Sequence, residues 1–244
     1  MKKTFLFLLL AISLTGYSQK CDNIKTVTFP SKDNLTVTAD LYTTMKAKDF
    51  IVLCHQAGFS RGEYINTAKI LQKMGYSALA IDQRSGNKVN NIINETHLEA
   101  KQKGLSTTYL DAKQDIETAI NYAFKLNHNK PIILVGSSYS SSLVLLIAAT
   151  NEKVKAVASF SPGEYLKGVN LAESIKNLNK PTFVTSSKSE INQTANVVRF
   201  VNTKYVTHFK PTVTGKHGSK ALWKSNAGHE TYWKAFSSFL KGIK

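Results

Sequence analysis

The sequence predicts a single α/β domain with a mostly parallel sheet, an antiparallel hairpin at its start, helices on both faces and no large lid. Strand-like and helix-like hydrophobic patterns alternate after residue 50, which is typical of β-α repeats around a parallel sheet. Two strand-like segments precede this region and lie close enough in sequence to form a hairpin. No linker, repeat or long insertion interrupts the 244 residues, which favours one core.

The predicted elements follow one another in a regular order. The hairpin strands are 24–29 and 35–42, and the later strands are 50–54, 77–81, 132–135, 154–160, 182–185 and 205–213. The helices are 63–74, 109–126, the segment after Ser138, 171–178, 191–201 and 226–240. Residues 82–105 are polar and rich in asparagine, which favours a long irregular loop or rim.

The most informative stretch surrounds Ser138. An apolar run at 131–135 suits a buried strand, and a second at 141–149 suits a buried helix. A serine at a sharp turn between such a strand and helix has its hydroxyl lifted clear of the sheet, as in the nucleophile elbow of the α/β-hydrolases. The turn needs small residues two positions to either side, and Gly136 and Ser140 provide them. The alternative is a serine-rich helix N-terminus without chemistry.

The candidate acid follows from elimination. In this fold the acid and then the histidine follow the serine along the chain. No aspartate occurs after Asp115, so a glutamate must serve. Glu190 comes just after the predicted strand 182–185, which is the usual position, and it is favoured. Glu164 follows the preceding strand and is the alternative acid.

The candidate base is His217. It lies between Gly215 and Gly218 in the loop after the last predicted strand, where an imidazole can turn toward the serine. His229 falls on the closing helix and His208 within a strand, so we expect structural roles for both.

A second loop supplies candidates for stabilising an oxyanion. The segment His55-Gln56-Ala57-Gly58 leaves the end of the predicted strand 50–54. Hydrolases of this fold use the backbone N–H of such a loop together with the amide after the nucleophile, here Tyr139. Either Gln56 or Ala57 would be the first donor, and the sequence does not separate them. We expect the His55 ring to hold the loop.

Taken together, these stretches resemble the α/β-hydrolases of the dienelactone-hydrolase and serine-aminopeptidase-like type, over nearly all of the chain after residue 19. The matching segments are 55–58, 61–64, 81–86, 136–140, 161–165 and 217–219. The chain departs from the family pattern at Gln56 and Ser140, where glycine is commoner, and at Glu190, where aspartate is commoner. Asp82-Gln83-Arg84 resembles a turn that is structural in the family.

The resemblance implies a serine hydrolase that cleaves a carboxylic ester or related acyl bond through a triad of Ser138, His217 and Glu190, with no cofactor and no metal. The substrate would be a small-molecule or polymer-linked acyl compound. A serine peptidase and a catalytically silent binding protein on the same scaffold are the alternatives. The family does not fix the acyl group, since one fold hosts many chemistries.

The first residues predict export. Lys2 and Lys3 precede a short apolar core at 5–14, so 1–19 is expected to be a cleaved signal peptide and 20–244 the hydrolase domain. The expected location is periplasmic or secreted. Lys20 occupies a position where lipidation of Cys21 would want a small residue, so a lipid anchor is not expected. Cys54 is expected to be a core residue rather than the disulfide partner of Cys21.

The charge balance is strongly basic. The chain has 32 Lys and Arg against 16 Asp and Glu, a formal charge of +16 and a pI near 9.7. This predicts weak electrostatic association with anionic surfaces. It does not predict nucleic-acid binding, since no basic run with interleaved aromatics and no known nucleic-acid module is present. The sequence leaves the oligomeric state unknown.

Overall fold

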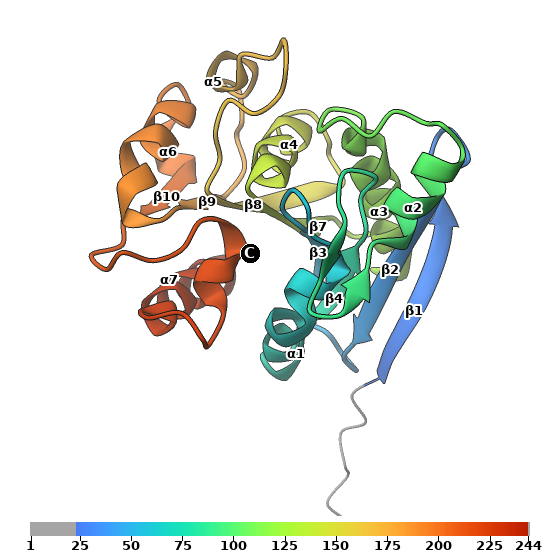
Figure 1. Ribbon diagram of the computed structural model, residues 1–244. Helices are drawn as coiled ribbons and strands as arrows, with labels where there is room; N and C mark the ends of the chain where they lie inside the picture. Colours follow the sequence, from blue (N-terminus) through green and yellow to red (C-terminus); the bar gives the residue numbers. More distant parts are fainter. Residues whose placement is uncertain (1–22, 244) are drawn as a thin grey trace, which may run out of the picture.

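In the computed structural model, which describes residues 23–243, a sheet of eight strands runs through the molecule in the order β1-β2-β4-β3-β7-β8-β9-β10 (Figure 1). β1 (Asn23–Pro30) and β2 (Thr36–Thr43) form an antiparallel hairpin, and β2 pairs antiparallel with β4 (Ser77–Ile81). All other pairs in this sheet are parallel. The remaining strands are β3 (Phe50–Cys54), β7 (Ile132–Ser137), β8 (Val154–Phe160), β9 (Thr182–Thr185) and β10 (Val206–Phe209). The predicted fold class is confirmed.

Helices cover both faces of the sheet (Figure 1). They are η1 (Arg61–Tyr64), α1 (Ile65–Lys73), α2 (Glu95–Gln102), α3 (Ala112–Leu126), α4 (Tyr139–Ala148), α5 (Leu171–Ser174), η2 (Lys188–Glu190), α6 (Ile191–Val197), η3 (Thr203–Tyr205), η4 (Gly218–Leu222) and α7 (His229–Gly242). α1 and α7 share one hydrophobic core, and α3, α4 and α6 share the other. Side chains of β3 alternate between the two, with Val52 in one core and Ile51 and Leu53 in the other. This burial on both faces explains why the strand is apolar throughout.

The region 82–105 is more ordered than its sequence predicts. It contains a short hairpin of β5 (Lys88–Val89) and β6 (Ile92–Ile93), followed by α2. Asn90 and Asn91 form the hairpin turn with φ of 49° and 62°, a conformation that asparagine tolerates. Asn94 caps α2 by accepting from the His97 amide at 2.7 Å. The asparagines that suggested a loop are therefore turn and cap residues.

Several element boundaries also differ from the prediction. β10 ends at Phe209 rather than 213, consistent with Pro211, which has no N–H to donate to a neighbouring strand. The closing helix begins at His229 rather than 226, because Asn226 is in a turn before Gly228, whose φ is +81°. The helix predicted at 191–201 ends at Val197, and the one predicted at 171–178 ends at Ser174.

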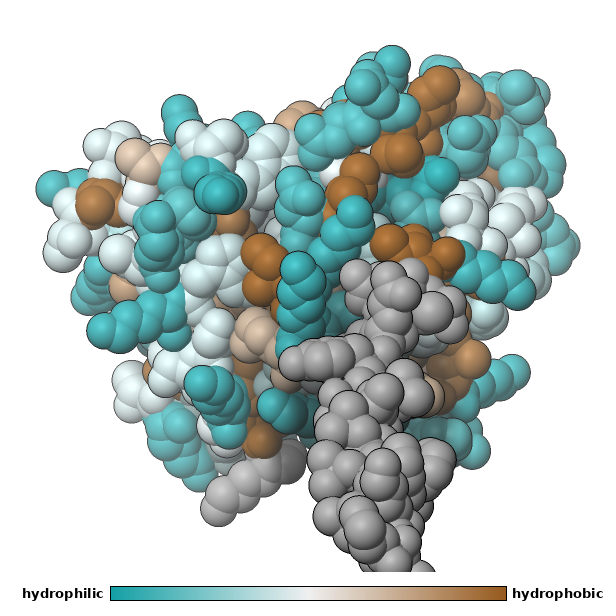
Figure 2. Space-filling view, turned by 90° about the horizontal axis from the view of Figure 1, so that it is seen from below, coloured by the Kyte–Doolittle hydropathy of each residue, from teal (hydrophilic) through white to brown (hydrophobic). Residues whose placement is uncertain are grey.

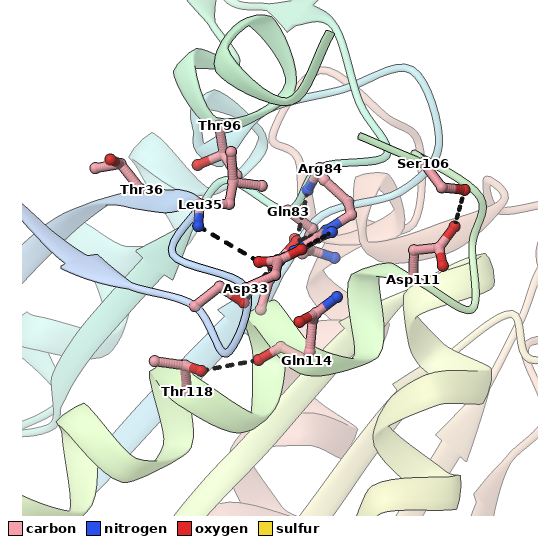
Figure 3. A network of polar contacts seen from close by, with 12 residues as sticks. Asp33, Leu35, Thr36, Gln83, Arg84, Thr96, Ser106, Asp111, Gln114 and Thr118 are labelled. Atoms are coloured by element: carbon pink, nitrogen blue, oxygen red, sulfur yellow. Dashed lines mark hydrogen bonds and ion pairs between the residues drawn. The ribbon is translucent and has the colours of Figure 1, made fainter. Parts of the chain in front are cut away.

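A buried ionic cluster joins the N-terminal hairpin to the sheet and to α3 (Figure 3). Arg84, in the turn after β4, is almost fully buried and bonds Asp115 of α3 at 2.7 Å and Asp33 of the hairpin turn at 2.7 Å. The Arg84 amide also donates to Asp115 at 2.9 Å. The hydrogen bond from Arg84 lowers the pKa of Asp33. In the same turn, Asp82 pairs with Arg61 at 2.6 Å, so this turn connects several elements.

The face seen from below carries mostly hydrophilic and neutral side chains, with hydrophobic ones in narrow strips (Figure 2). Among residues 23–243, none of the helices combines the length and the apolar character that crossing a bilayer requires. Cys54 is a free thiol in the core, and burial raises its pKa. The predicted signal peptide, Lys20 and Cys21 lie outside the described residues.

Candidate active site

Ser138 lies at a strained turn between β7 and α4. Its φ of 57° and ψ of −123° are unfavourable for a residue with a side chain, and such strain is concentrated at functional sites. Gly136 is required because a Cβ there would lie 2.5 Å from the carbonyl oxygen of Ser140. Ser140, where the family commonly has glycine, donates its hydroxyl to the carbonyl of His55 at 2.5 Å. That serine therefore ties the elbow to the loop after β3.

His217 is held against Ser138 by the loop after β10. Its Nε2 lies 2.7 Å from Ser138 Oγ, and its Nδ1 lies 2.5 Å from Glu190 Oε1. A carboxylate can only accept, so Nδ1 carries a proton and donates it to Glu190. Nε2 is then free to accept the Ser138 hydroxyl proton. The structure thus brings together the serine, histidine and glutamate that the sequence selected.

Glu190 is fixed by its second oxygen. Oε2 accepts from the Ser187 hydroxyl at 2.6 Å, from the Ser187 amide at 3.1 Å and from the Ser161 hydroxyl at 3.0 Å. Ser187 and Glu190 form a capping box at the start of η2. Burial raises the pKa of Glu190, but the hydrogen bonds from His217 and Ser187 outweigh burial and lower it to about 2. The carboxylate is therefore ionised at neutral pH.

Glu164, the alternative acid, is used elsewhere. Its Oε2 accepts from the Leu171 amide at 2.8 Å and its Oε1 from the Ala172 amide at 3.3 Å. It is thus bonded to the first turn of α5. Of the two candidate acids, the structure brings only Glu190 to His217.

The loop after β3 distinguishes the two candidate oxyanion donors. The Gln56 amide donates to the buried carboxylate of Glu63 at 2.7 Å, so it has its acceptor within the protein. Among the described residues, the Ala57 amide makes no such bond. The Tyr139 amide opens α4, where the first amides of a helix have no partner within the helix. Ala57 and Tyr139 are therefore the available donors.

The His55 ring holds this loop in place. Its Nδ1 donates to the Gln56 carbonyl at 2.8 Å, and its Nε2 accepts from the Gln83 amide at 3.1 Å. Burial lowers the pKa of His55 to about 4, which keeps the ring neutral. His208 and His229 lie apart from the triad, since His229 bonds the Asn226 carbonyl and His208 is on β10.

Sequence reasoning missed two residues beside the triad, Ser161 and Glu63. Ser161 follows β8 with a φ of 59°, and its hydroxyl accepts from the Gly218 amide at 2.9 Å while donating to Glu190. Glu63 accepts from both the loop after β3 and the loop that carries His217. The segments 161–165 and 61–64 match the family pattern, but their sequence does not indicate that these two side chains bond to the triad or to its loops.

Solved structures with this fold include several hydrolases. The esterase Pf2001 from Pyrococcus furiosus is 16% identical, with 90% of each chain covered and a TM-score of 0.67. A dienelactone hydrolase from Anabaena variabilis is 16% identical, with 91% of this chain and 98% of that chain covered and a TM-score of 0.69. A thermostable carboxyl esterase from Bacillus coagulans is 11% identical, with coverages of 90% and 98% and a TM-score of 0.68. At these identities the similarity shows the fold.

A search of curated proteins found no match. A family model does match, and it covers residues 45–216 under the description "Serine aminopeptidase, S33". The matched span runs from before β3 to the residue before His217, and it includes Ser138 and Glu190. It covers most of the chain. The protein therefore belongs to this serine aminopeptidase (S33) family of α/β-hydrolases.

Proposed function

We propose that this hydrolase cleaves a carboxylic ester or a related acyl bond, with Ser138 as nucleophile, His217 as general base and acid, and Glu190 as the orienting carboxylate. The observation that carries the proposal is the unbroken hydrogen-bonded chain from Ser138 through His217 to Glu190, at 2.7 Å and 2.5 Å. Nucleophile, base and orienting group within hydrogen-bond reach are the signature of an activated serine.

The proposed reaction has two halves. Ser138 Oγ bonds to the substrate carbonyl carbon while its proton passes to His217 Nε2, and the carbonyl oxygen becomes an oxyanion. The amides of Ala57 and Tyr139 donate to that oxygen, and one such donor is worth a factor of about 100 to 1,000 in kcat. The bond to the leaving group then breaks, and His217 returns the proton to it. In the second half, water attacks the carbonyl carbon of the acyl-enzyme while its proton passes to His217. The bond to Ser138 Oγ then breaks, and His217 returns the proton to Ser138.

Glu190 serves in both halves. Because its pKa is lowered to about 2, the carboxylate keeps its charge and stabilises the imidazolium that forms at His217. It also selects the tautomer with the proton on Nδ1. The esterases and the dienelactone hydrolase among the similar structures support ester cleavage as the reaction type.

A serine peptidase is the second candidate, because the matching family model carries the description of an aminopeptidase. Such an enzyme needs a carboxylate that can hold the substrate amine. Glu164 was the obvious candidate, but both of its oxygens accept amides of α5. We therefore favour the ester reaction over the peptidase reaction. The aligned triad likewise favours an enzyme over a silent binding protein.

The test is a substrate screen with a chemical probe on residues 20–244. We expect turnover of p-nitrophenyl acyl esters, little turnover of aminoacyl p-nitroanilides, and labelling of Ser138 by a fluorophosphonate. Ser138→Ala should lose the label and about three to six orders of magnitude in kcat. Ser174→Ala, on the exposed end of α5, is the matched control and should keep both. Labelling that persists in Ser138→Ala would contradict the proposal, and efficient cleavage of anilides alone would favour the peptidase.

We also propose that the chain is exported and that its basic surface gives weak, salt-sensitive attachment to anionic membranes. Mass spectrometry of the exported protein should find an N-terminus near Lys20. An intact Met1, or a lipid on Cys21, would contradict a cleaved and soluble product. Binding to anionic vesicles should be lost as salt is added, because salt shortens the Debye length to about 8 Å at physiological ionic strength and to about 3 Å at 1 M.

A further inference from the structure

Glu63 is a buried carboxylate between the two loops of the site. It lies on η1, and only 1% of its surface is exposed. Its Oε2 accepts from the Gln56 amide at 2.7 Å, and its Oε1 accepts from the Ser219 hydroxyl at 2.5 Å. Gln56 immediately precedes Ala57, and Ser219 lies two residues after His217. One carboxylate therefore contacts the oxyanion loop and the histidine loop together.

These contacts bear on the direction of the Ala57 N–H. The Gln56 carbonyl accepts from His55 Nδ1 at 2.8 Å and from the Phe59 amide at 3.3 Å. In a trans peptide the N–H points opposite to the carbonyl, so these bonds aim the Ala57 N–H away from them. The bond from the Gln56 amide to Glu63 fixes the other side of the same residue. By holding the Gln56 amide, Glu63 thus restricts the rotation of the Gln56 backbone that would change the direction of the Ala57 N–H.

The histidine loop is anchored by a parallel set of bonds. The Ser219 amide donates to Ser137 Oγ at 2.8 Å, and the Gly218 amide donates to Ser161 Oγ at 2.9 Å. Gly218 has no room for a side chain, since a Cβ would lie 2.5 Å from Ser137 Oγ. Glu63 adds a bond to the Ser219 side chain, and its own carbonyl accepts from Trp223 Nε1 at 3.1 Å. His217 therefore leaves a loop whose following residues are fixed.

A carboxylate is a costly way to fill this space. Burial raises the pKa of Glu63, while hydrogen bonds from Ser219 and the Gln56 amide oppose that rise. An apolar side chain could fill the same volume without the desolvation cost. An apolar side chain could not accept hydrogen bonds from both loops.

We propose that Glu63 is a positioning residue, which holds the Ala57 amide and the loop of His217 in the relative positions that catalysis requires. The inference rests on the function proposed above. Glu63 makes no hydrogen bond to the nucleophile or to the triad histidine, and it acts through Gln56 and Ser219. Because a misdirected N–H affects the oxyanion more than the bound substrate, the loss should fall on kcat rather than on KM.

The test measures kcat and KM of Glu63→Gln and Glu63→Ala with a p-nitrophenyl ester. The concentration of active sites, on which kcat is based, is taken from fluorophosphonate labelling. Glu63→Ala, which loses both acceptors, should lower kcat about 100-fold, and Glu63→Gln, which keeps one, about tenfold. KM should stay within about twofold. The affinity for a boronic acid, which becomes tetrahedral on the serine, should fall with kcat. Glu99→Gln is the matched control, since Glu99 accepts from the amide and hydroxyl of Thr36 away from both loops.

Normal kcat per labelled site and normal boronic acid affinity in Glu63→Gln would overturn the proposal, even if the variant melts earlier. Should Glu63→Ala not fold, Ser219→Ala removes one bond and leaves the carboxylate. Its effect on kcat should be smaller than that of Glu63→Gln, and the double variant should lose less than the product of the two. Independent effects would contradict a shared role. Failure of the proposed function itself would differ, because the parent protein would then not label at Ser138.

Discussion

Glu190 Oε1 lies 2.5 Å from His217 Nδ1, and this bond joins two loops that follow different strands, β9 and β10. The two strands are parallel neighbours, so their carboxyl ends meet at one edge of the sheet. A glutamate can take the place of the commoner aspartate here because it is the third residue of η2 and forms a capping box with Ser187, whose hydroxyl fixes the second carboxylate oxygen. The longer side chain is thereby held in a single orientation toward the histidine.

Glu190→Gln should lower kcat/KM for an ester at least about tenfold, and up to about 10,000-fold. Glutamine keeps the shape but loses the charge that stabilises the imidazolium, and its amide can select the wrong tautomer. Steady-state kinetics at pH 7 measures this. For Glu164→Gln, kcat/KM should stay near the parent value, because the Glu164 carboxylate bonds only amides of α5. A crippled Glu164→Gln beside an active Glu190→Gln would reverse the assignment of the acid.

The same residue predicts a pH dependence of stability. The folded pKa of Glu190 is lowered from 4.5 to about 2, so its contribution to the free energy of unfolding is present above pH 4.5. That contribution is lost as the pH falls toward 2. Glu190→Gln should therefore lose less stability than the parent between pH 6 and pH 3. Urea unfolding at several pH values measures the difference, and Glu152→Gln, at an exposed position, is the control. Equal losses for Glu190→Gln and the parent would be inconsistent with the low pKa.

Much of the site could be predicted because the chain order of the fold restricts the choices. With no aspartate after Asp115, the chain order left Glu190 and Glu164 as candidate acids and favoured Glu190, and the structure brings Glu190 to His217 and His217 to Ser138. Gln56 and Ala57 could not be separated, because the difference lies in a bond to Glu63, whose location in space is not encoded by spacing. Ser161 was also missed, because it has a positive φ, which is unusual for serine and which the sequence does not indicate.

The fold could be predicted where burial produces a regular hydrophobic pattern in the sequence. It was harder to predict where asparagine residues determine the local structure. The central strands β3, β4 and β7 are apolar runs bounded by turns, and the strands of the sheet were found within a few residues. The hairpin of β5 and β6 and helix α2 were missed because asparagine favours loops, turns and helix caps alike. Only tertiary contacts distinguish these outcomes.

Gly136→Ala should destabilise the protein and lower its activity. A Cβ at this position would lie 2.5 Å from the Ser140 carbonyl oxygen and 2.8 Å from the Ser141 Cα, both of which are backbone atoms that cannot move independently. Overpacking of this kind costs about 1 to 3 kcal/mol. Urea unfolding and ester turnover would measure the two effects. Gly242→Ala, where no atom lies within 4 Å of an added Cβ, should show no loss, and equal behaviour of the two variants would argue against a tight elbow.

Arg84→Met should be among the most destabilising single changes, at about 3 to 5 kcal/mol, because it leaves Asp115 buried with no cation to pair with. Asp115 is fully buried, and its remaining bonds, from the Ser31 hydroxyl and from the backbone amide of residue 84, cannot replace an ion pair. Arg84→Met combined with Asp115→Leu removes both charges and should therefore recover part of the loss. Urea unfolding at pH 7 compares the variants with Lys176→Ala, whose exposed pair with Glu173 should be worth about 0 to 1 kcal/mol. A double variant less stable than Arg84→Met would show that the polar bonds of Asp115, and not its unpaired charge, dominate this cluster.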